Sequence, residues 1–186
     1  MEECTPEAVQ RMLPQVSEQR REQALRYKHT LGQFCCLKSW LMLSALHIGE
    51  MEFLYNEHGK PYWAGGPYFS ISHCKEAIAV VIDDLPVGID IEAIRPANEE
   101  LIRHTMNEKE QEQIHSDRDF IRFWTQKEAI VKAQGIGIES FEQLQNILSC
   151  QSSAFSIQTI EHEKYIYSIA YGKLCSISAE IPAADL

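Results

Sequence analysis

The sequence predicts an α+β protein built from two similar lobes. A helical pattern followed by short strand-like segments occupies residues 17–92, and the same order is found again in residues 100–178. The 186 residues, of which 45% are hydrophobic, can form one sizeable domain or two small packed halves. In such a fold we expect the ligand cleft between the lobes.

In the first lobe we expect a helix from Ser17 to about His47, because apolar residues recur there every three to four positions. Phe53 and Tyr55 alternate with polar neighbours, which favours a strand that ends at the turn signal Asn56–Gly59. Further short strands, rich in β-branched and apolar residues, are expected at Phe69–Ser72, Ala77–Ile82 and Val87–Ile91. A turn separates the last two, so an antiparallel meander is predicted.

In the second lobe, the best helix of the chain is expected from about Asp119 to Gln134, where Gly135 ends it. Shorter helices are predicted at Glu99–Thr105 and Glu108–Ile114. Half-buried strands are predicted at Phe155–Ile160, Tyr165–Tyr171 and Leu174–Ile177, with a hairpin turn at Tyr171–Lys173.

The net charge of −10 argues against general nucleic-acid binding, which depends on Lys and Arg. An anionic ligand must therefore meet a local basic site. The densest one is Arg20–Arg21 with Arg26 and Lys28, for which a solvated helix face is an equally good interpretation.

The six cysteines include the adjacent pair Cys35–Cys36 and no Cys-x-x-Cys spacing, which favours reduced cytosolic thiols. The acidic start Met1–Cys4 does not resemble a secretory signal, and no apolar run approaches the roughly 18 residues of a membrane span. We expect a soluble cytoplasmic protein without membrane association.

Two acidic residues flank Ile91 on a predicted strand. Asp90 and Glu92 leave the same face of that strand, near its end, at a spacing that suits one hard cation such as Mg²⁺. Taken alone, the tripeptide is more often the solvated face of an edge strand.

On the helix from Asp119, three side chains form one stripe at i, i+4 spacing: Trp124, Glu128 and Lys132. An ordinary surface ion pair is the simplest interpretation of Glu128 and Lys132 alone. The large apolar Trp124 on the same stripe instead favours a half-buried pair at the wall of a cleft.

The end of the strand at Ser72–His73 offers donors for phosphate oxygens. A Ser–His nucleophile pair is disfavoured because adjacent strand residues point to opposite faces, and a structural histidine remains an alternative. Gly59–Lys60–Pro61 places one cation in a loop, although a tight turn explains the Gly and Pro equally well.

Together, four separated segments resemble, in the right order, the signature motifs of Sfp-type 4'-phosphopantetheinyl transferases. They are Gly59–Pro61, Phe69–His73, Gly88–Glu92 and Trp124–Lys132. The resemblance covers about residues 17–140. It implies the fold of the holo-acyl-carrier-protein synthase superfamily: two pseudo-symmetric lobes, here residues 1–97 and 98–186, each a small antiparallel sheet packed on a long helix, with coenzyme A between them.

The resemblance implies Mg²⁺-dependent transfer of the phosphopantetheine arm of coenzyme A to a serine of an apo acyl or peptidyl carrier protein, leaving 3',5'-ADP. By the same resemblance, Asp90, Glu92 and Glu128 would hold Mg²⁺, and Glu128 could also be the base. Lys132 would contact the transferred phosphate. The other expected coenzyme contacts are Arg20, Lys60, Ser72 and His73, of which Arg20 matches the family pattern least closely.

The chain also departs from the family pattern. The strand that usually opens the family is expected to be absent or reduced to Met1–Cys4, and the segments at Ala64–Pro67 and between Arg95 and Phe120 are short. The carrier, and hence the fatty acid, polyketide or nonribosomal peptide pathway, therefore does not follow from the resemblance. A monomer is expected because both lobes lie in one chain. A Mg²⁺-dependent pyrophosphate hydrolase and a non-catalytic coenzyme A or carrier-binding module are the alternatives.

Overall fold

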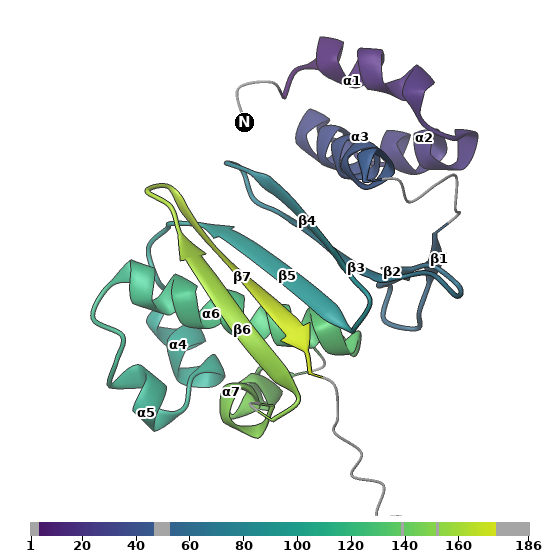
Figure 1. Ribbon diagram of the computed structural model, residues 1–186. Helices are drawn as coiled ribbons and strands as arrows, with labels where there is room; N and C mark the ends of the chain where they lie inside the picture. Colours follow the sequence, from purple (N-terminus) through teal and green to yellow (C-terminus); the bar gives the residue numbers. More distant parts are fainter. Residues whose placement is uncertain (1–3, 47–52, 139, 152, 174–186) are drawn as a thin grey trace, which may run out of the picture.

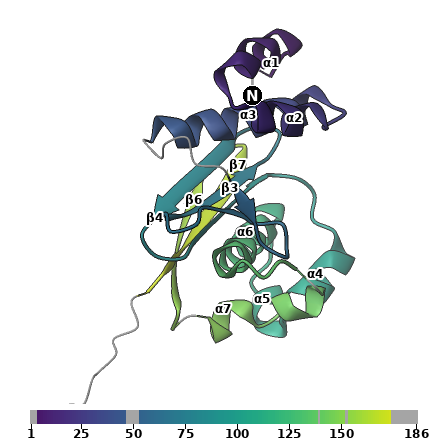
Figure 2. The same ribbon diagram turned by 90° about the vertical axis from the view of Figure 1, so that its right-hand side faces the viewer.

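The fold, taken from a computed structural model, is described for residues 4–46, 53–138, 140–151 and 153–173. Its strands lie between two groups of helices, one from each half of the chain (Figures 1 and 2). Small antiparallel sheets packed on helices confirm the predicted α+β class.

The first half begins with helices. They are α1 (Pro6–Met12), the 3-10 turn η1 (Leu13–Gln15), α2 (Glu18–Leu25) and α3 (Thr30–Ala45). α1 was not predicted from the sequence, although Thr5 caps it with a side-chain hydrogen bond from Ala8 N and Pro6 occupies its first turn. The buried side chains of α1 pack against Phe34 and Leu37 of α3.

The single helix predicted from Ser17 to His47 is wrong, because α2 and α3 are separate. The chain turns after Leu25, where Tyr27 N bonds to Ala24 O. Tyr27 packs directly on Gly32, where an added Cβ would lie 2.7 Å from the tyrosine ring. His47 lies outside the described residues.

The strands of the first half are β1 (Leu54–Tyr55), β2 (Pro61–Tyr62), β3 (Tyr68–His73), β4 (Ile78–Asp83) and β5 (Val87–Ala93). β1 pairs with β2, and β3 pairs antiparallel with β4. A cluster of aromatic side chains, Phe53, Trp63 and Phe69, packs together with Trp40 of α3 beneath these strands.

The predicted meander is wrong at its third strand. β5 forms a main-chain ladder with β7 (Tyr165–Gly172), and β7 also pairs with β6 (Phe155–Glu161). On its other side, β5 is joined to β3 by side chains: Ile89 N donates to Ser70 Oγ and Ile91 N to Ser72 Oγ. Serine hydroxyls thus replace the main-chain carbonyls that a continuous sheet would use.

The helices of the second half are α4 (Glu99–Thr105), α5 (Glu108–Gln111), α6 (Asp117–Gln134), the 3-10 turn η2 (Phe141–Leu144) and α7 (Ile147–Cys150). The predictions of α4 and α6 are confirmed, and Gly135 ends α6 with a φ of 73°. No helix among the described residues is long and apolar enough to cross a membrane.

Tyr171 and Gly172 were predicted in a hairpin turn but belong to β7, and Gly172 N–H donates to Pro86 O. Within the described chain a hairpin turn joins β6 to β7, where His162 N bonds to Tyr165 O. The strand predicted at Leu174–Ile177 lies outside the described residues.

The contact between β5 and α6 positions the candidate site. At Gly88, an added Cβ would lie 2.0 Å from Ala129 O and 2.4 Å from Ala133 N of α6. Only glycine allows the strand to lie this close to the helix main chain. The acidic residues that follow Gly88 are thereby held beside the polar stripe of α6.

Candidate functional site

Asp90 is the centre of a polar cluster to which three elements contribute. Its side chain, on β5, is buried, and Oδ1 accepts hydrogen bonds from Lys132 Nζ of α6 at 2.6 Å and from Ser72 Oγ of β3 at 2.9 Å. The structure therefore brings together three of the residues predicted from sequence.

The hydroxyl of Ser72 is fully engaged within this cluster. It donates to Asp90, and its oxygen accepts from Ile91 N at 3.2 Å and from Lys132 Nζ at 3.0 Å. A hydroxyl has one proton and two lone pairs, and all are used here. Ser72 thus orients Asp90 and Lys132 in this arrangement and has no remaining donor for a phosphate oxygen.

Two further carboxyl groups belong to the same electrostatic environment. Burial, followed by the charge of Asp90, raises the pKa of Glu128 to about 7. The same two causes, in the same order, raise the pKa of Glu92, which lies 3.8 Å from Arg95. Asp90 thus makes ionisation less favourable at both neighbours, as expected for clustered acids with too little positive charge.

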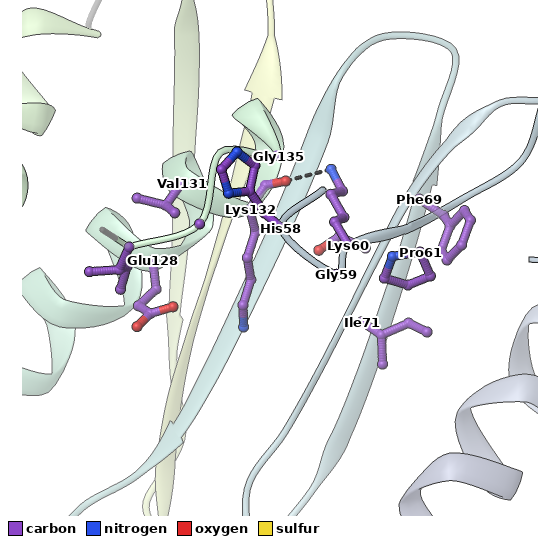
Figure 3. A pocket seen from close by; sticks show the side chains of 13 residues that line it. His58, Gly59, Lys60, Pro61, Phe69, Ile71, Glu128, Val131, Lys132 and Gly135 are labelled. Atoms are coloured by element: carbon purple, nitrogen blue, oxygen red, sulfur yellow. Dashed lines mark hydrogen bonds between the residues drawn. The ribbon is translucent and has the colours of Figure 1, made fainter. Parts of the chain in front are cut away.

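A pocket of about 370 Å³ lies beside this cluster. Glu128 and Lys132 reach it from α6, and Pro61, Phe69 and Ile71 form the facing wall (Figure 3). Residues from both halves of the chain therefore line one cavity that combines an apolar wall with charged groups.

Lys60 also lines this pocket, but its ammonium contacts the protein main chain. Lys60 Nζ donates to Lys132 O near the end of α6 (Figure 3). Burial lowers the pKa of Lys60. A cation at this end of a helix is favoured by the helix dipole and by the carbonyls that have no partner within the helix.

His73 lies at the end of β3, where its side chain is exposed and its residue pairs with Ile78. Partial desolvation by the surrounding chain and the charge of Lys132 lower the pKa of His73. The histidine is thus close enough to Lys132 for their charges to interact, although it does not line the pocket described above.

The structure does not bring Arg20 to the pocket. Its side chain is buried, with the guanidinium carbon 4.5 Å from the ring centre of Phe53 and 4.8 Å from that of Trp40. Its Nη1 lies 3.7 Å from Cys36 Sγ. Arg20 therefore joins α2 to the aromatic cluster through cation–π contacts.

The chemistry of the acidic residues suits a hard divalent cation. Asp90 Oδ2 is buried and has no hydrogen-bond partner among the described residues, and the charge of Asp90 helps to raise the pKa of Glu92 and Glu128. A cation would supply the missing partner and charge. As they stand, the described residues contain no group of three or more His, Cys, Asp or Glu side chains arranged to hold a metal ion, and Lys132 occupies the other oxygen of Asp90.

Two residues near the site were missed from the sequence. Asn56 was interpreted only as part of a turn, yet its side chain donates a hydrogen bond to Gly135 O, just after the end of α6. Lys127 belongs to the α6 motif but received no role, and it forms a fully buried ion pair with Glu110. Sequence periodicity could have indicated only that Lys127 faces away from the stripe that carries Glu128.

Comparison with known proteins identifies the family. A family model described as the 4'-phosphopantetheinyl transferase superfamily matches residues 86–175. The chain is also 37% identical over 134 residues to the 4'-phosphopantetheinyl transferase AcpT of Salmonella typhimurium, a match that covers 64% of this chain and 68% of AcpT. This chain belongs to the 4'-phosphopantetheinyl transferase superfamily. The predicted resemblance is confirmed, and the matched region includes both hallmark segments, Gly88–Glu92 and Trp124–Lys132.

Other members of the superfamily are similar over a comparable part of the chain. A 4'-phosphopantetheinyl transferase of Bacillus subtilis is 28% identical over 143 residues, which cover 69% of this chain and 64% of the relative. The 4'-phosphopantetheinyl transferase gsp of Aneurinibacillus migulanus is 29% identical over 153 residues, which cover 75% of this chain and 65% of the relative. The chain thus spans slightly less than two thirds of these two relatives.

Proposed function

We propose that this protein transfers the 4'-phosphopantetheine group of coenzyme A to a serine hydroxyl of an apo carrier protein, leaving 3',5'-ADP. The observation that carries the proposal is the convergence of Asp90, Lys132 and Ser72 beside a pocket that Glu128 also lines. Membership of the 4'-phosphopantetheinyl transferase superfamily supplies the reaction class.

In the proposed reaction, the serine oxygen of the carrier bonds to the phosphorus that bears pantetheine, and the bond from that phosphorus to 3',5'-ADP breaks. Glu128 accepts the serine proton. In the metal-free protein the pKa of Glu128 is raised to about 7, so the carboxyl is partly ionised at neutral pH, and bound Mg²⁺ would favour the ionised form that a base requires. The nucleophile belongs to the partner, so this chain needs no nucleophilic side chain of its own.

Lys132 provides positive charge for the transferred phosphoryl group. Its ammonium is held by Asp90 and Ser72, so its position is fixed before a substrate arrives. Preorganised charge of this kind stabilises the transition state without a cost of reorganisation. His73 and Lys60, which lie near Lys132, are the proposed further contacts of the coenzyme phosphates and nucleotide; Arg20 is left out because its guanidinium packs on aromatic rings.

We further propose that Asp90, Glu92 and Glu128 hold Mg²⁺ in the working enzyme. When bound, the ion would neutralise charge on the pyrophosphate and orient it for in-line displacement. The buried free oxygen of Asp90 and the raised pKa values of both glutamates support this assignment.

The proposed partners are coenzyme A and an apo acyl or peptidyl carrier protein, with the enzyme acting as a monomer in the cytoplasm. Among the described residues the cysteines are free thiols, namely Cys4, Cys35, Cys36, Cys74 and Cys150. This is the state that a reducing compartment maintains.

The test incubates the protein with coenzyme A, Mg²⁺ and a panel of apo carrier proteins and measures the mass of each carrier. A gain of one phosphopantetheine group supports transfer. Cleavage of coenzyme A without a gain identifies a hydrolase, and neither product identifies a binding module. EDTA should abolish the gain, and excess Mg²⁺ should restore it.

Matched variants connect the activity to the site. Asp90→Asn should abolish transfer, because an amide keeps the shape but removes the charge that faces Lys132. Asp84→Asn, the same change at an exposed turn, should leave transfer intact. Full turnover in Asp90→Asn would refute the assignment of Asp90.

A further inference from the structure

The turn from Asn56 to Lys60 caps the end of α6. Asn56 Nδ2 donates to Gly135 O at 2.7 Å, and Lys60 Nζ donates to Lys132 O. The last carbonyls of a helix have no partner within it. Here two of them are satisfied by side chains from a turn about 75 residues earlier in the sequence.

Asn56 also organises the turn itself. Its Oδ1 accepts hydrogen bonds from His58 N at 3.0 Å and from Lys60 N at 2.8 Å. Its main chain bonds to Lys60 O and to Gly59 N, each at 3.0 Å. One side chain therefore fixes the main chain of Lys60 and, through its other end, the helix terminus.

The fit at Gly135 leaves little room for an alternative arrangement. A Cβ added there would lie 3.3 Å from Asn56 Nδ2 and 3.4 Å from Lys60 Cδ. Gly135 also has a φ of 73°, which favours glycine. Asn56 and Lys60 of the turn therefore both pack closely against Gly135 at the end of the helix.

The contact between the turn and α6 involves both lysines that line the pocket, Lys60 and Lys132. Lys132 is held at its main chain by Lys60 and at its ammonium by Asp90 and Ser72. Asn56 does not line this pocket, whereas Lys60 does. A change at Asn56 can therefore reach the pocket only through the residues that it holds.

We infer that Asn56 is a positioning residue, which fixes Lys60 against the end of α6 and so preorganises the pocket for coenzyme A. The inference rests on the proposed function for its ligand. Coenzyme A should then bind more weakly when the cross-link is lost, because Lys60 must be ordered at the time of binding. Asp90 is held by Ser72 and by the ammonium of Lys132, not by this turn, so phosphoryl transfer should proceed at a similar rate.

The deciding variant is Asn56→Ser, with Asn98→Ser as its matched control. Serine keeps a side-chain acceptor for the turn, adds no charge and is too short to reach Gly135 O. Asn98 caps α4 with the same side-chain oxygen, and serine is also a good helix cap. Both variants should fold, which a thermal melt verifies.

The expected result for Asn56→Ser is a five- to tenfold rise, by order of magnitude, in the KM for coenzyme A, corresponding to one lost hydrogen bond. The kcat should stay within about threefold, and the dissociation constant for coenzyme A should rise in parallel with KM. Asn98→Ser should change neither. If Asn56 served only the stability of the turn, Asn56→Ser would lower the melting temperature and leave the KM for coenzyme A unchanged.

Hydrogen exchange gives a measurement that does not require activity. Gly135 N–H donates to Val131 O at 2.9 Å, so its exchange reports opening of the last turn of α6. Exchange at Gly135 should accelerate in Asn56→Ser and not in Asn98→Ser. Unchanged KM and unchanged exchange in Asn56→Ser would overturn the inference. A wild-type protein that transfers nothing would refute the proposed function, and the exchange result would still decide whether the cross-link exists.

Discussion

The hydroxyl of Ser72 donates a hydrogen bond of 2.9 Å to Oδ1 of Asp90, across the boundary between β3 and β5. Its oxygen also accepts from Lys132 Nζ and from Ile91 N. The serine thus holds the carboxylate and the ammonium in their relative positions.

Ser72→Ala should therefore lower kcat by roughly ten- to a hundredfold and change the KM for coenzyme A by less than about threefold. It should also cost about 1–3 kcal/mol of unfolding free energy, because Ile91 N and Lys132 lose a partner in a buried environment. Steady-state kinetics and urea unfolding measure both. Ser149→Ala, on the exposed surface of α7, is the control. A raised KM with normal kcat would return Ser72 to the role of a phosphate contact.

The raised pKa of Glu128 predicts a specific pH dependence of stability. The folded state holds the proton up to about pH 7, whereas an unfolded glutamate releases it near 4.5. Between these values the folded state binds more protons, so stability falls as pH rises, by about 3 kcal/mol in total. Above pH 7 the full loss of stability caused by ionising Glu128 is present, and below pH 4.5 it is absent.

Glu128→Gln removes this cost. In EDTA the variant should be more stable than the wild type by about 3 kcal/mol at pH 8 and by less than about 1 kcal/mol at pH 5, while losing transfer. Urea unfolding at the two pH values makes the comparison. The opposite contribution of His73, whose pKa is lowered, is common to both proteins and cancels. Equal stability at pH 8 would show that Glu128 is not destabilised by its surroundings.

The contact of Gly88 with α6 predicts a severe effect of one methyl group. In Gly88→Ala the new Cβ would meet main-chain atoms, Ala129 O and Ala133 N, which cannot rotate away. We expect a loss of 3 kcal/mol or more, on the order of the largest overpacking effects. Gly65→Ala is the matched control: Gly65 has a φ of 72° and open space around it, so only the backbone cost of about 1–2 kcal/mol applies. Similar melting temperatures for the two variants would contradict the close packing.

Local sequence signals predicted most individual elements but not how they pair. α6 was predictable because an amphipathic pattern ends at a glycine, and α4 because its length and position follow from periodicity. β5 was recognised as a strand, yet its partner β7 begins more than 70 residues later. A local pattern does not specify such a long-range partner.

The candidate site was likewise only partly predictable from the sequence. Spacing placed Asp90 and Glu92 on one face of a strand, and Glu128 and Lys132 on one face of a helix, but their prediction as a site came from the resemblance to the family. Asn56 was not predicted, because its hydrogen bond to Gly135 spans 79 residues and its turn chemistry alone explains its presence. Arg20 was expected at the ligand from the resemblance to the family, but no sequence signal indicated that its guanidinium would pack on Trp40 and Phe53.

A buried ion pair supports the middle of α6, where Trp124 and Glu128 also lie. Lys127 Nζ donates to Glu110 Oε2 at 2.6 Å and to Leu144 O at 2.7 Å, so it joins α6 to α5 and η2. The lysine side chain is fully buried, and burial lowers its pKa despite the partner. Lys127→Met should cost about 3–5 kcal/mol, because Glu110 is left as an uncompensated buried charge.

The double variant Lys127→Met/Glu110→Gln should be more stable than the sum of the single losses predicts, by at least about 1 kcal/mol, because no charge remains to be compensated. Urea unfolding of the wild type, both single variants and the double variant closes this cycle. The pair Arg118–Glu161, joined at 2.9 Å but about one third exposed on each side, is the comparison and should give a coupling of roughly 0.2–1 kcal/mol. If the two cycles gave equal coupling energies, burial would not be what makes the Lys127–Glu110 pair strong.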